Sequence, residues 1–303
     1  TWLTHYLYGV DNHVESLPAV LAQNNYDPSK WTSYDNWKSS QRLFLNAQSK
    51  RLEETISSDY AAAGVEIANR NETVSKASSK ANLTFVSDVT EDTTIKGHIP
   101  VHFKAALAKG QGKNFQINAL LVDMADEDFD VVGNGSVKQD KTADGFWMGS
   151  NLSNLSVAEY ETIKTKYKVI AKGWINLANP ESGYDSASSR ASIEPKVGEY
   201  HDYTVFLQPN LYTVKKGHKL ALVFNTYDPS DLTVEHPYEV TFKTDSIQAA
   251  IPIVEKTSAQ KAAYVPSATD TDYANLPEVE GAALVAPEVH YKEEYTLPSP
   301  EYF

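Results

Sequence analysis

The chain has 303 residues, 41% of them hydrophobic, and a formal net charge of -13, so it can bury a sizeable core. It contains no cysteine, which excludes disulfides, thiolate metal sites and cysteine nucleophiles. The negative charge disfavours binding of nucleic acid and anionic lipid, because affinity for phosphate depends on clustered Lys and Arg. The sequence contains no run of about 18 apolar residues, the length needed to span a bilayer.

The first nine residues predict the end of a helix. Trp2, Leu3, Tyr6 and Leu7 have helical spacing, and Gly9 is a usual residue just past a helix C-terminus. No capping residue or loop precedes them, and no charged-then-apolar leader is present. We therefore interpret the chain as a piece excised from a longer protein.

Strands follow the helix. The 18 Tyr and 5 Trp, together with frequent Thr and Val, favour strands over helical bundles. An aromatic loop is expected over residues 27–37, and residues 47–80 show no clear pattern. A short apolar run predicts a strand at residues 18–23, and another strand is expected at residues 41–45, after the aromatic loop. Alternating apolar residues predict strands at residues 82–86 and 97–106.

The second half of the chain continues the strand pattern. A strand ending at residue 122 precedes an acidic loop, residues 123–130, and residues 157–166 are a short helical candidate. Residues 203–207 alternate, and the turn at 215–217 leads into residues 220–224, as in a hairpin. The remaining predicted strands cover residues 168–177, 238–242 and 247–254.

Many short strands joined by polar loops, with little helix between them, predict an antiparallel sandwich or jelly roll. After residue 254 the composition changes to Ala, Pro, Glu and Asp with few large aliphatic residues. Such a composition predicts a largely extended tail.

Residues 2–12 resemble the helix that closes the α/β-hydrolase domain of X-prolyl dipeptidyl-peptidases and of their cocaine-esterase and acylase relatives. The strand at residues 18–23, then Trp31 and Trp37, then residues 42–45 are similar to that family's crossing into its C-terminal jelly roll. The resemblance covers residues 1 to about 254. Further landmarks follow in the family's order at residues 93–98, 120–123, 172–174, 190, 199–203, 207–209 and 217–220.

The resemblance implies an all-β fold, an antiparallel jelly-roll β-sandwich of the galactose-binding-like type, with a short N-terminal helix left from an α/β-hydrolase domain. It divides the chain into the terminal helix of a truncated hydrolase domain (residues 1–16), the sandwich (17–254) and an acidic Pro-rich tail (255–303). The implied function is that of the non-catalytic C-terminal domain of a serine X-prolyl dipeptidyl-peptidase, whose parent releases Xaa-Pro dipeptides from peptide N-termini. Such a domain would support the catalytic domain, oligomerisation or surface contacts.

The family's catalytic serine lies on a Gly-x-Ser-x-Gly elbow, and its aspartate and histidine follow before the helix with which this chain begins. No Gly-x-Ser-x-Gly occurs in the 303 residues, so the strained turn that presents the nucleophile is absent. We assign no catalytic, cofactor-binding or metal residue and expect no cofactor. Whether a catalytic half accompanies the chain stays open.

Histidines offer alternative sites. His5 and His13 lie near the resembling helix, but the family's histidine lies upstream, so we interpret both as surface or helix-packing residues. His98 and His102 have a metal-ligand spacing for a helix, yet the alternation around them favours a strand with both on one solvated face. No third zinc ligand is evident nearby in the sequence.

The acidic residues between 123 and 130 could collect oxygen ligands for calcium in a loop. The EF-hand spacing fails, because Val131 stands where the loop glycine belongs and Val137 where the bidentate glutamate belongs. Calcium binding and an ordinary acidic turn both stay open.

Aromatic loops and sequons offer two further interpretations. The side chains of Trp31, Tyr34 and Trp37, or that of Trp147, could form a platform that binds sugar rings, or they could simply pack in the core. The sequon pattern is short and arises readily by chance. It occurs at Asn71, Asn82, Asn134, Asn151 and Asn154.

The predicted partners are the chain's own catalytic α/β-hydrolase domain, a second copy in a homodimer, and cell wall or glycan; nucleic acid and a membrane span are not expected. The Pro- and Glu-rich tail resembles wall-spanning stalks of Gram-positive surface proteins, which predicts a secreted or cell-surface location, with the cytoplasm as the alternative. The alternative function is a free-standing carbohydrate-binding or adhesin module.

Overall fold

The computed structural model describes residues 2–9, 11, 14–16, 18–28, 30–39, 41–47, 53–58, 82–137, 160–180, 192–226 and 236–254. Within these residues, helix α1 (Trp2–Tyr8) and the 3-10 helix η1 (Val14–Ser16) precede a series of strands. No helix among them has the length and hydrophobicity needed to cross a bilayer. The strands are β1 (Val20–Gln23), β2 (Trp31–Tyr34), β3 (Gln41–Asn46), β4 (Glu53–Ser57), β5 (Asn82–Asp88), β6 (Thr93–Lys109), β7 (Gln116–Val137), β8 (Tyr160–Asn176), β9 (His201–Val214), β10 (Lys219–Asn225) and β11 (Glu239–Ile253).

The chain divides into two compact units. One comprises Thr1–Trp37, Asp130–Ile163 and Ala259–Thr296; the other comprises Lys38–Phe129, Lys164–Ser258 and Leu297–Phe303. The domain boundaries expected at residues 16 and 254 stay predictions, and the tail at 255–303 lies outside the described residues.

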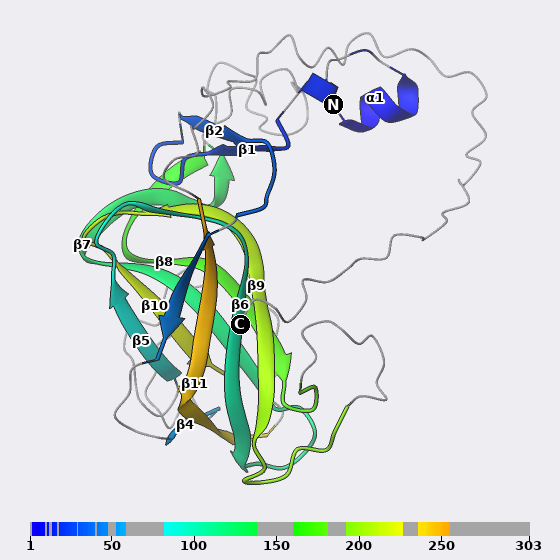
Figure 1. Ribbon diagram of the computed structural model, residues 1–303, viewed down its shortest axis with the longest axis vertical. Coiled ribbons are helices and arrows are strands. Elements are labelled where there is room, and N and C mark those ends of the chain that lie inside the picture. The colour runs from blue at the N-terminus through cyan, green and yellow to red at the C-terminus, as the bar shows by residue number, and fades with distance from the viewer. Residues whose placement is uncertain are drawn as a thin grey trace. The chain divides into compact units, whose positions relative to one another are not determined.

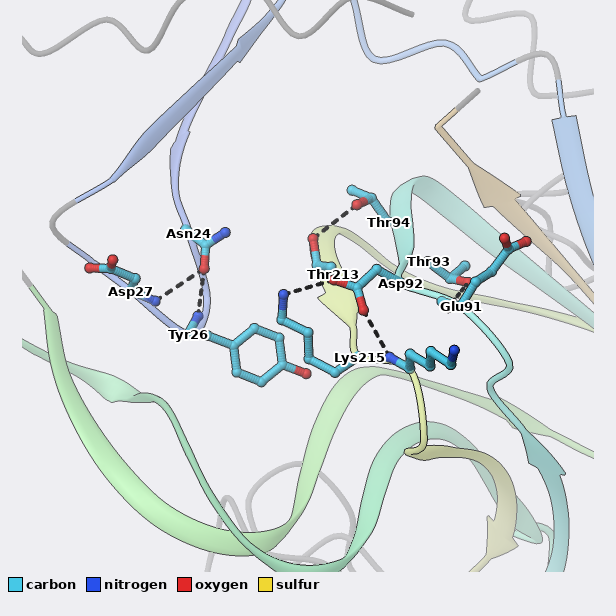
Figure 2. Close-up of polar contacts among 10 residues, drawn as sticks. Asn24, Tyr26, Asp27, Glu91, Asp92, Thr93, Thr94, Thr213 and Lys215 are labelled. Carbon is cyan, nitrogen blue, oxygen red and sulfur yellow. Dashed lines mark hydrogen bonds and ion pairs between the residues drawn. The ribbon is translucent and has the colours of Figure 1, made fainter. Parts of the chain in front are cut away.

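The first unit holds α1 and an antiparallel pair of strands, β1 and β2. Asn24 closes the loop between them, because its Oδ1 accepts hydrogen bonds from the backbone N–H of Tyr26 (2.9 Å) and Asp27 (3.0 Å), as Figure 2 shows. The backbone N–H of Asn24 also donates to the carbonyl oxygen of Lys30 at 2.8 Å. The predicted aromatic loop is therefore wrong at residues 31–34, where β2 forms.

The second unit is an antiparallel β-sandwich, which confirms the predicted all-β fold. One sheet has the order β5-β10-β7-β8, and the other has the order β3-β11-β6-β9, with β4 also pairing with β11. In Figure 1, β11, β6 and β9 lie in one layer, and β5 and β10 lie in the other. The buried rings of Phe103 on β6, Phe242 on β11 and Phe224 on β10 meet between the layers at centroid distances of 5.1 to 5.4 Å. These rings form the centre of the hydrophobic core.

Strand β7 passes through the stretch that the sequence predicts as an acidic loop. Its residues pair with β10 as far as Met124 opposite Lys219, and the strand continues to Val137. The acidic side chains after Asp123 are largely exposed, so a strand can carry them without burying their charge. The prediction of a loop at residues 123–130 is wrong.

Strand β8 contradicts the predicted short helix at residues 157–166 over its described part, residues 160–166. The structure shows a strand from Tyr160, and the more buried residues between 163 and 169 alternate with exposed or half-buried lysines. Side chains of a strand alternate between faces, so this period of two fits a strand and not a helix. The predicted strand at residues 168–177 is the second half of the same element.

Strands β9 and β10 are joined by the predicted turn, but they do not form a hairpin. β9 pairs with β6, while β10 pairs with β5 and β7 in the other sheet. Gly217 in the turn has a φ of 86°, a conformation that glycine adopts without steric cost. The turn therefore carries the chain from one sheet to the other.

Strand β11 unites the two predicted strands at residues 238–242 and 247–254. Its pairing with β6 shifts between Lys243 and Gln248, so the strand contains a bulge. The hydroxyl of Ser246 accepts the backbone N–H of Lys104 at 2.8 Å and donates to the carbonyl oxygen of Lys243 at 2.6 Å. These two bonds satisfy backbone groups that the bulge would otherwise leave unpaired. Strand β4, from the stretch without a clear sequence pattern, pairs with the first part of β11.

Tyr238 joins the start of β11 to the start of β7. Its hydroxyl donates to the carbonyl oxygen of Gln116 at 2.7 Å and accepts the backbone N–H of the same residue at 3.0 Å. Its ring lies edge-on to that of Phe115, with centroids 5.4 Å apart. Burial raises the pKa of Tyr238 from 10.0 to about 12, although the hydrogen bond to Gln116 lowers it in part.

This pKa predicts a loss of stability at high pH. As the pH rises above 10, the unfolded chain loses its phenolic proton while folded Tyr238 keeps it. The contribution of Tyr238 to the free energy of unfolding is therefore complete below pH 10, and it falls between pH 10 and 12 by about 1.4 kcal/mol per pH unit. Urea unfolding at pH 9, 10 and 11 measures this slope. The Tyr238→Phe variant should show a shallower slope than the original chain; an identical slope would contradict the assignment.

Candidate functional site

Asp123 is the centre of a buried polar cluster between the two sheets. Its side chain on β7 is 0% exposed, and its Oδ2 accepts a hydrogen bond from the hydroxyl of Tyr212 on β9 at 2.9 Å. Its Oδ1 lies 2.8 Å from Nδ1 of His218, in the turn after β9. The ring of Phe129 lies against the imidazole at a centroid distance of 4.7 Å. Asp123 therefore connects the two sheets: its charged carboxylate is hydrogen-bonded to Tyr212 of the other sheet and to His218 of the turn between the sheets.

The sequence does not pair these residues. Asp123 belongs to the acidic run and His218 to a separate landmark, 95 positions away. One sequence signal points to this cluster: Asp123 directly follows the buried residues Leu121 and Val122, and a charged side chain at such a position requires a partner.

A second carboxylate, Asp92, holds the same turn from its exposed side. Its Oδ2 lies 2.8 Å from Nζ of Lys215, as Figure 2 shows. Its Oδ1 accepts the backbone N–H of Lys216 at 2.9 Å. The hydrogen bond from Lys215 and then that from Lys216 hold the pKa of Asp92 below its usual value. Two backbone hydrogen bonds between Val89 and residues 217 and 218, of 2.8 and 2.9 Å, fix the turn to the preceding loop. The crossover turn is thus fixed from both sides.

The structure describes three of the four candidate histidines, His5, His98 and His102. Nε2 of His5, on α1, lies 3.4 Å from Oε1 of Glu15, while His13 lies outside the described residues. His98 and His102 lie on strand β6 as predicted, and Nε2 of His102 lies 3.2 Å from Oδ1 of Asp202. Among the described residues, no group of three or more His, Asp and Glu side chains could hold a metal ion.

The acidic run is arranged unlike a calcium loop. Asp123 points into the core, whereas the exposed Asp126 accepts a hydrogen bond from Nζ of Lys219 at 2.7 Å. That bond lowers the pKa of Asp126. Neighbouring carboxylates of a strand point to opposite faces, so the run is divided between the two faces of β7, and calcium binding there stays a prediction.

The predicted aromatic platform is only partly described. Trp37 is exposed and Tyr34 is half-buried. The sequon residue Asn82 is buried on β5, so its side chain is not accessible in the folded chain. The side chains of Trp31 and Asn134 and the residues His13, Asn71, Trp147, Asn151, Asn154 and Arg190 lie outside the described residues.

A groove of about 370 Å³ lies beside β3 and β5, the end strands of the two sheets. Phe44 and Val86 are exposed in it. None of the lining residues is charged, so they offer no acid, base or ion pair for chemistry. They are Phe44, Leu45, Asn46, Ala47, Thr84, Phe85, Val86, Ser87 and Leu222.

Comparison with known proteins places the chain in a family. Residues 12–275, which include every strand from β1 to β11, match the family described as "X-Pro dipeptidyl-peptidase C-terminal non-catalytic domain". The chain is 27% identical over 268 residues to the Xaa-Pro dipeptidyl-peptidase of Ligilactobacillus salivarius, covering 81% of this chain and 31% of that protein. It is 28% identical over 253 residues to that of Lactiplantibacillus plantarum, covering 75% and 29%. The chain therefore spans about three tenths of the length of these relatives.

A solved structure shows a similar fold. A CocE/NonD family hydrolase from Staphylococcus aureus superposes with a TM-score of 0.51 and 12% sequence identity, over 84% of this chain and 44% of that chain. Because the family match covers most of the chain and all strands of the sandwich, and because no nucleophile elbow occurs in the sequence, this chain belongs to the family of X-Pro dipeptidyl-peptidase C-terminal non-catalytic domains.

Proposed function

We propose that this chain supports the catalytic α/β-hydrolase domain of an Xaa-Pro dipeptidyl-peptidase and catalyses no reaction by itself. The family match over residues 12–275 carries the proposal. The sequence supports it, because a serine peptidase of this type requires a nucleophile on a strained turn and no Gly-x-Ser-x-Gly is present. The polar clusters around Asp123 and Asp92 support a scaffold role, since their carboxylates are bound to neighbouring side chains or backbone groups.

Helix α1 supports docking onto another domain. Leu3 and Leu7 are 67% and 70% exposed, and they lie one turn apart on the same side of the helix. Gly9 ends the helix as predicted, with a φ of 66° and its N–H bonded to the carbonyl oxygen of His5. An exposed apolar stripe on a helix is typical of a surface that a partner covers. We propose that the catalytic domain is this partner.

Two measurements test the proposal. The purified 303-residue chain should release no p-nitroaniline from Gly-Pro-p-nitroanilide, because it holds no nucleophile of this class. It should bind the separately expressed catalytic portion of an Xaa-Pro dipeptidyl-peptidase and raise its melting temperature. Turnover by the chain alone, or failure to bind, would overturn the proposal.

A helix variant makes the test specific. Burying two leucines contributes about 3 kcal/mol or more, so Leu3→Ser with Leu7→Ser should weaken this binding by about 100-fold. Val197→Ser is the matched control, because Val197 is a similarly exposed aliphatic residue (64%) in the other unit, and its binding should stay within twofold. Equal effects of the two variants would argue against docking through α1.

A further inference from the structure

Three asparagine side chains lie next to one another at one end of the sheet β5-β10-β7-β8. Asn225 on β10 pairs in register with Asn82 on β5 and with Asn118 on β7. Each of the three is at most 5% exposed. Directly paired residues of neighbouring strands point to the same side of a sheet, so the three amides form a row, which we call the asparagine row.

The asparagine row is joined by hydrogen bonds. Nδ2 of Asn118 donates to Oδ1 of Asn225 at 3.0 Å, and the hydroxyl of Thr84 donates to Oδ1 of Asn82 at 3.1 Å. In this arrangement the nitrogen of the Asn118 amide makes the bond to Asn225, so its oxygen points away from Asn225. Oδ1 of Asn118 is therefore an acceptor that requires a donor.

Two buried acceptors beside the row have no hydrogen-bond partner in the described part of the chain. They are Oδ1 of Asn118 and Oε1 of Gln116. The two residues are two positions apart on β7, so their side chains point to the same face. Native proteins pair nearly all buried acceptors with protein or with ordered water. Two such oxygens on one face indicate a ligand between the side chains and not two separate defects.

We propose that Gln116 and Asn118 bind buried, ordered water that completes the asparagine row. Water both donates and accepts, so it satisfies Gln116 whichever way its amide is oriented, and it donates to Asn118. A divalent cation is a poorer ligand, because it prefers carboxylates and the described residues hold no cluster of three His, Asp or Glu side chains. Both groups that bind the water lie at the start of β7, and Asn118 is in turn bonded to Asn225 of β10.

The sign of a stability change tests the proposal. Gln116→Met keeps the length of the side chain and removes the amide. If Oε1 faced an empty space, removal of an unsatisfied acceptor would raise the melting temperature. If the oxygen binds water, the variant should melt lower, by about 2–4 °C for a chain of this size. Gln41→Met is the matched control at an exposed strand position, and its melting temperature should not change. A raised melting temperature for Gln116→Met would overturn the proposal.

A second measurement identifies the ligand. A crystal structure of the chain should show a water oxygen about 2.8 Å from Oδ1 of Asn118, and this water should be absent from the Asn118→Leu variant. Melting temperatures in NaCl, KCl, CaCl₂ and EDTA should agree at equal ionic strength. A cation-specific rise that Gln116→Met abolishes would replace water by that cation and overturn the assignment, as would a site without density.

Discussion

Asp123→Ala is expected to lower the free energy of unfolding by about 3–5 kcal/mol. The substitution removes a carboxylate that is 0% exposed and breaks its hydrogen bonds with the buried hydroxyl of Tyr212 and with Nδ1 of the half-buried His218. Loss of a hydrogen-bond partner from a buried polar group costs about 1–3 kcal/mol, and the small cavity left by the side chain lowers the stability further. Urea unfolding at pH 7 measures the change.

Matched variants separate the cluster from a general effect of charge. Asp126→Ala removes an exposed carboxylate from the same strand and should leave the unfolding midpoint unchanged, because its partner Lys219 can return to water. Tyr212→Phe removes one hydrogen bond and should cost about 1–2 kcal/mol. In a double-mutant cycle, Asp123→Ala and Tyr212→Phe should be non-additive. Equal losses for Asp123→Ala and Asp126→Ala would show that the buried cluster has no special role.

Gly173→Ala should be the second large effect, with a loss of about 3 kcal/mol or more. A Cβ at Gly173, on β8, would lie 2.6 Å from the carbonyl oxygen of Phe206 and 2.9 Å from Cγ1 of Val205, both on β9. The nearest atom belongs to the backbone, so the two strands would have to separate. Separation would also weaken the nearby hydrogen bond from Asn210 of β9 to the carbonyl oxygen of Ile170. Thermal and urea unfolding measure the loss.

Gly133→Ala is the control for this substitution. Its Cβ would first meet Cγ2 of Ile163 at 3.2 Å, a side-chain atom that can move, so the change should stay within about 1 kcal/mol. Both variants replace glycine by alanine, so both lower the conformational entropy of the unfolded chain by the same amount, and this effect cancels in the comparison. A similar small effect at both positions would show that β8 and β9 can separate without cost.

The sequence predicts most strands because alternation is a local property. Residues 82–86 and 97–106 alternate, and strands β5 and β6 form there. The same rule contradicts the helix predicted at residues 157–166, because burial alternates from Ile163 to Tyr167 and strand β8 begins at Tyr160. It fails at residues 238–254, since the bulge between Lys243 and Gln248 interrupts the alternation inside one strand.

The candidate site was less predictable than the fold. Resemblance to X-prolyl dipeptidyl-peptidases named the family that the comparisons confirm, and the missing nucleophile elbow excluded this family's active site. The sequence does not predict the cluster of Asp123 with His218, and it wrongly predicts a loop for the acidic run. Composition shows where the charged residues are, but not which side chains of other strands lie opposite them. The secreted location, the jelly-roll connectivity, the homodimer and glycan binding stay predictions.

The sequence by itself determined the all-β class, the positions of the main strands and the lack of a nucleophile elbow, since each depends on residues close together in the chain. Only the tertiary structure decided that β9 and β10 join different sheets, that Asp123 lies between Tyr212 and His218, and that β8 approaches β9 at Gly173. Asp123 and His218, for example, are 95 positions apart. These contacts depend on how two sheets pack face to face, which no local pattern encodes.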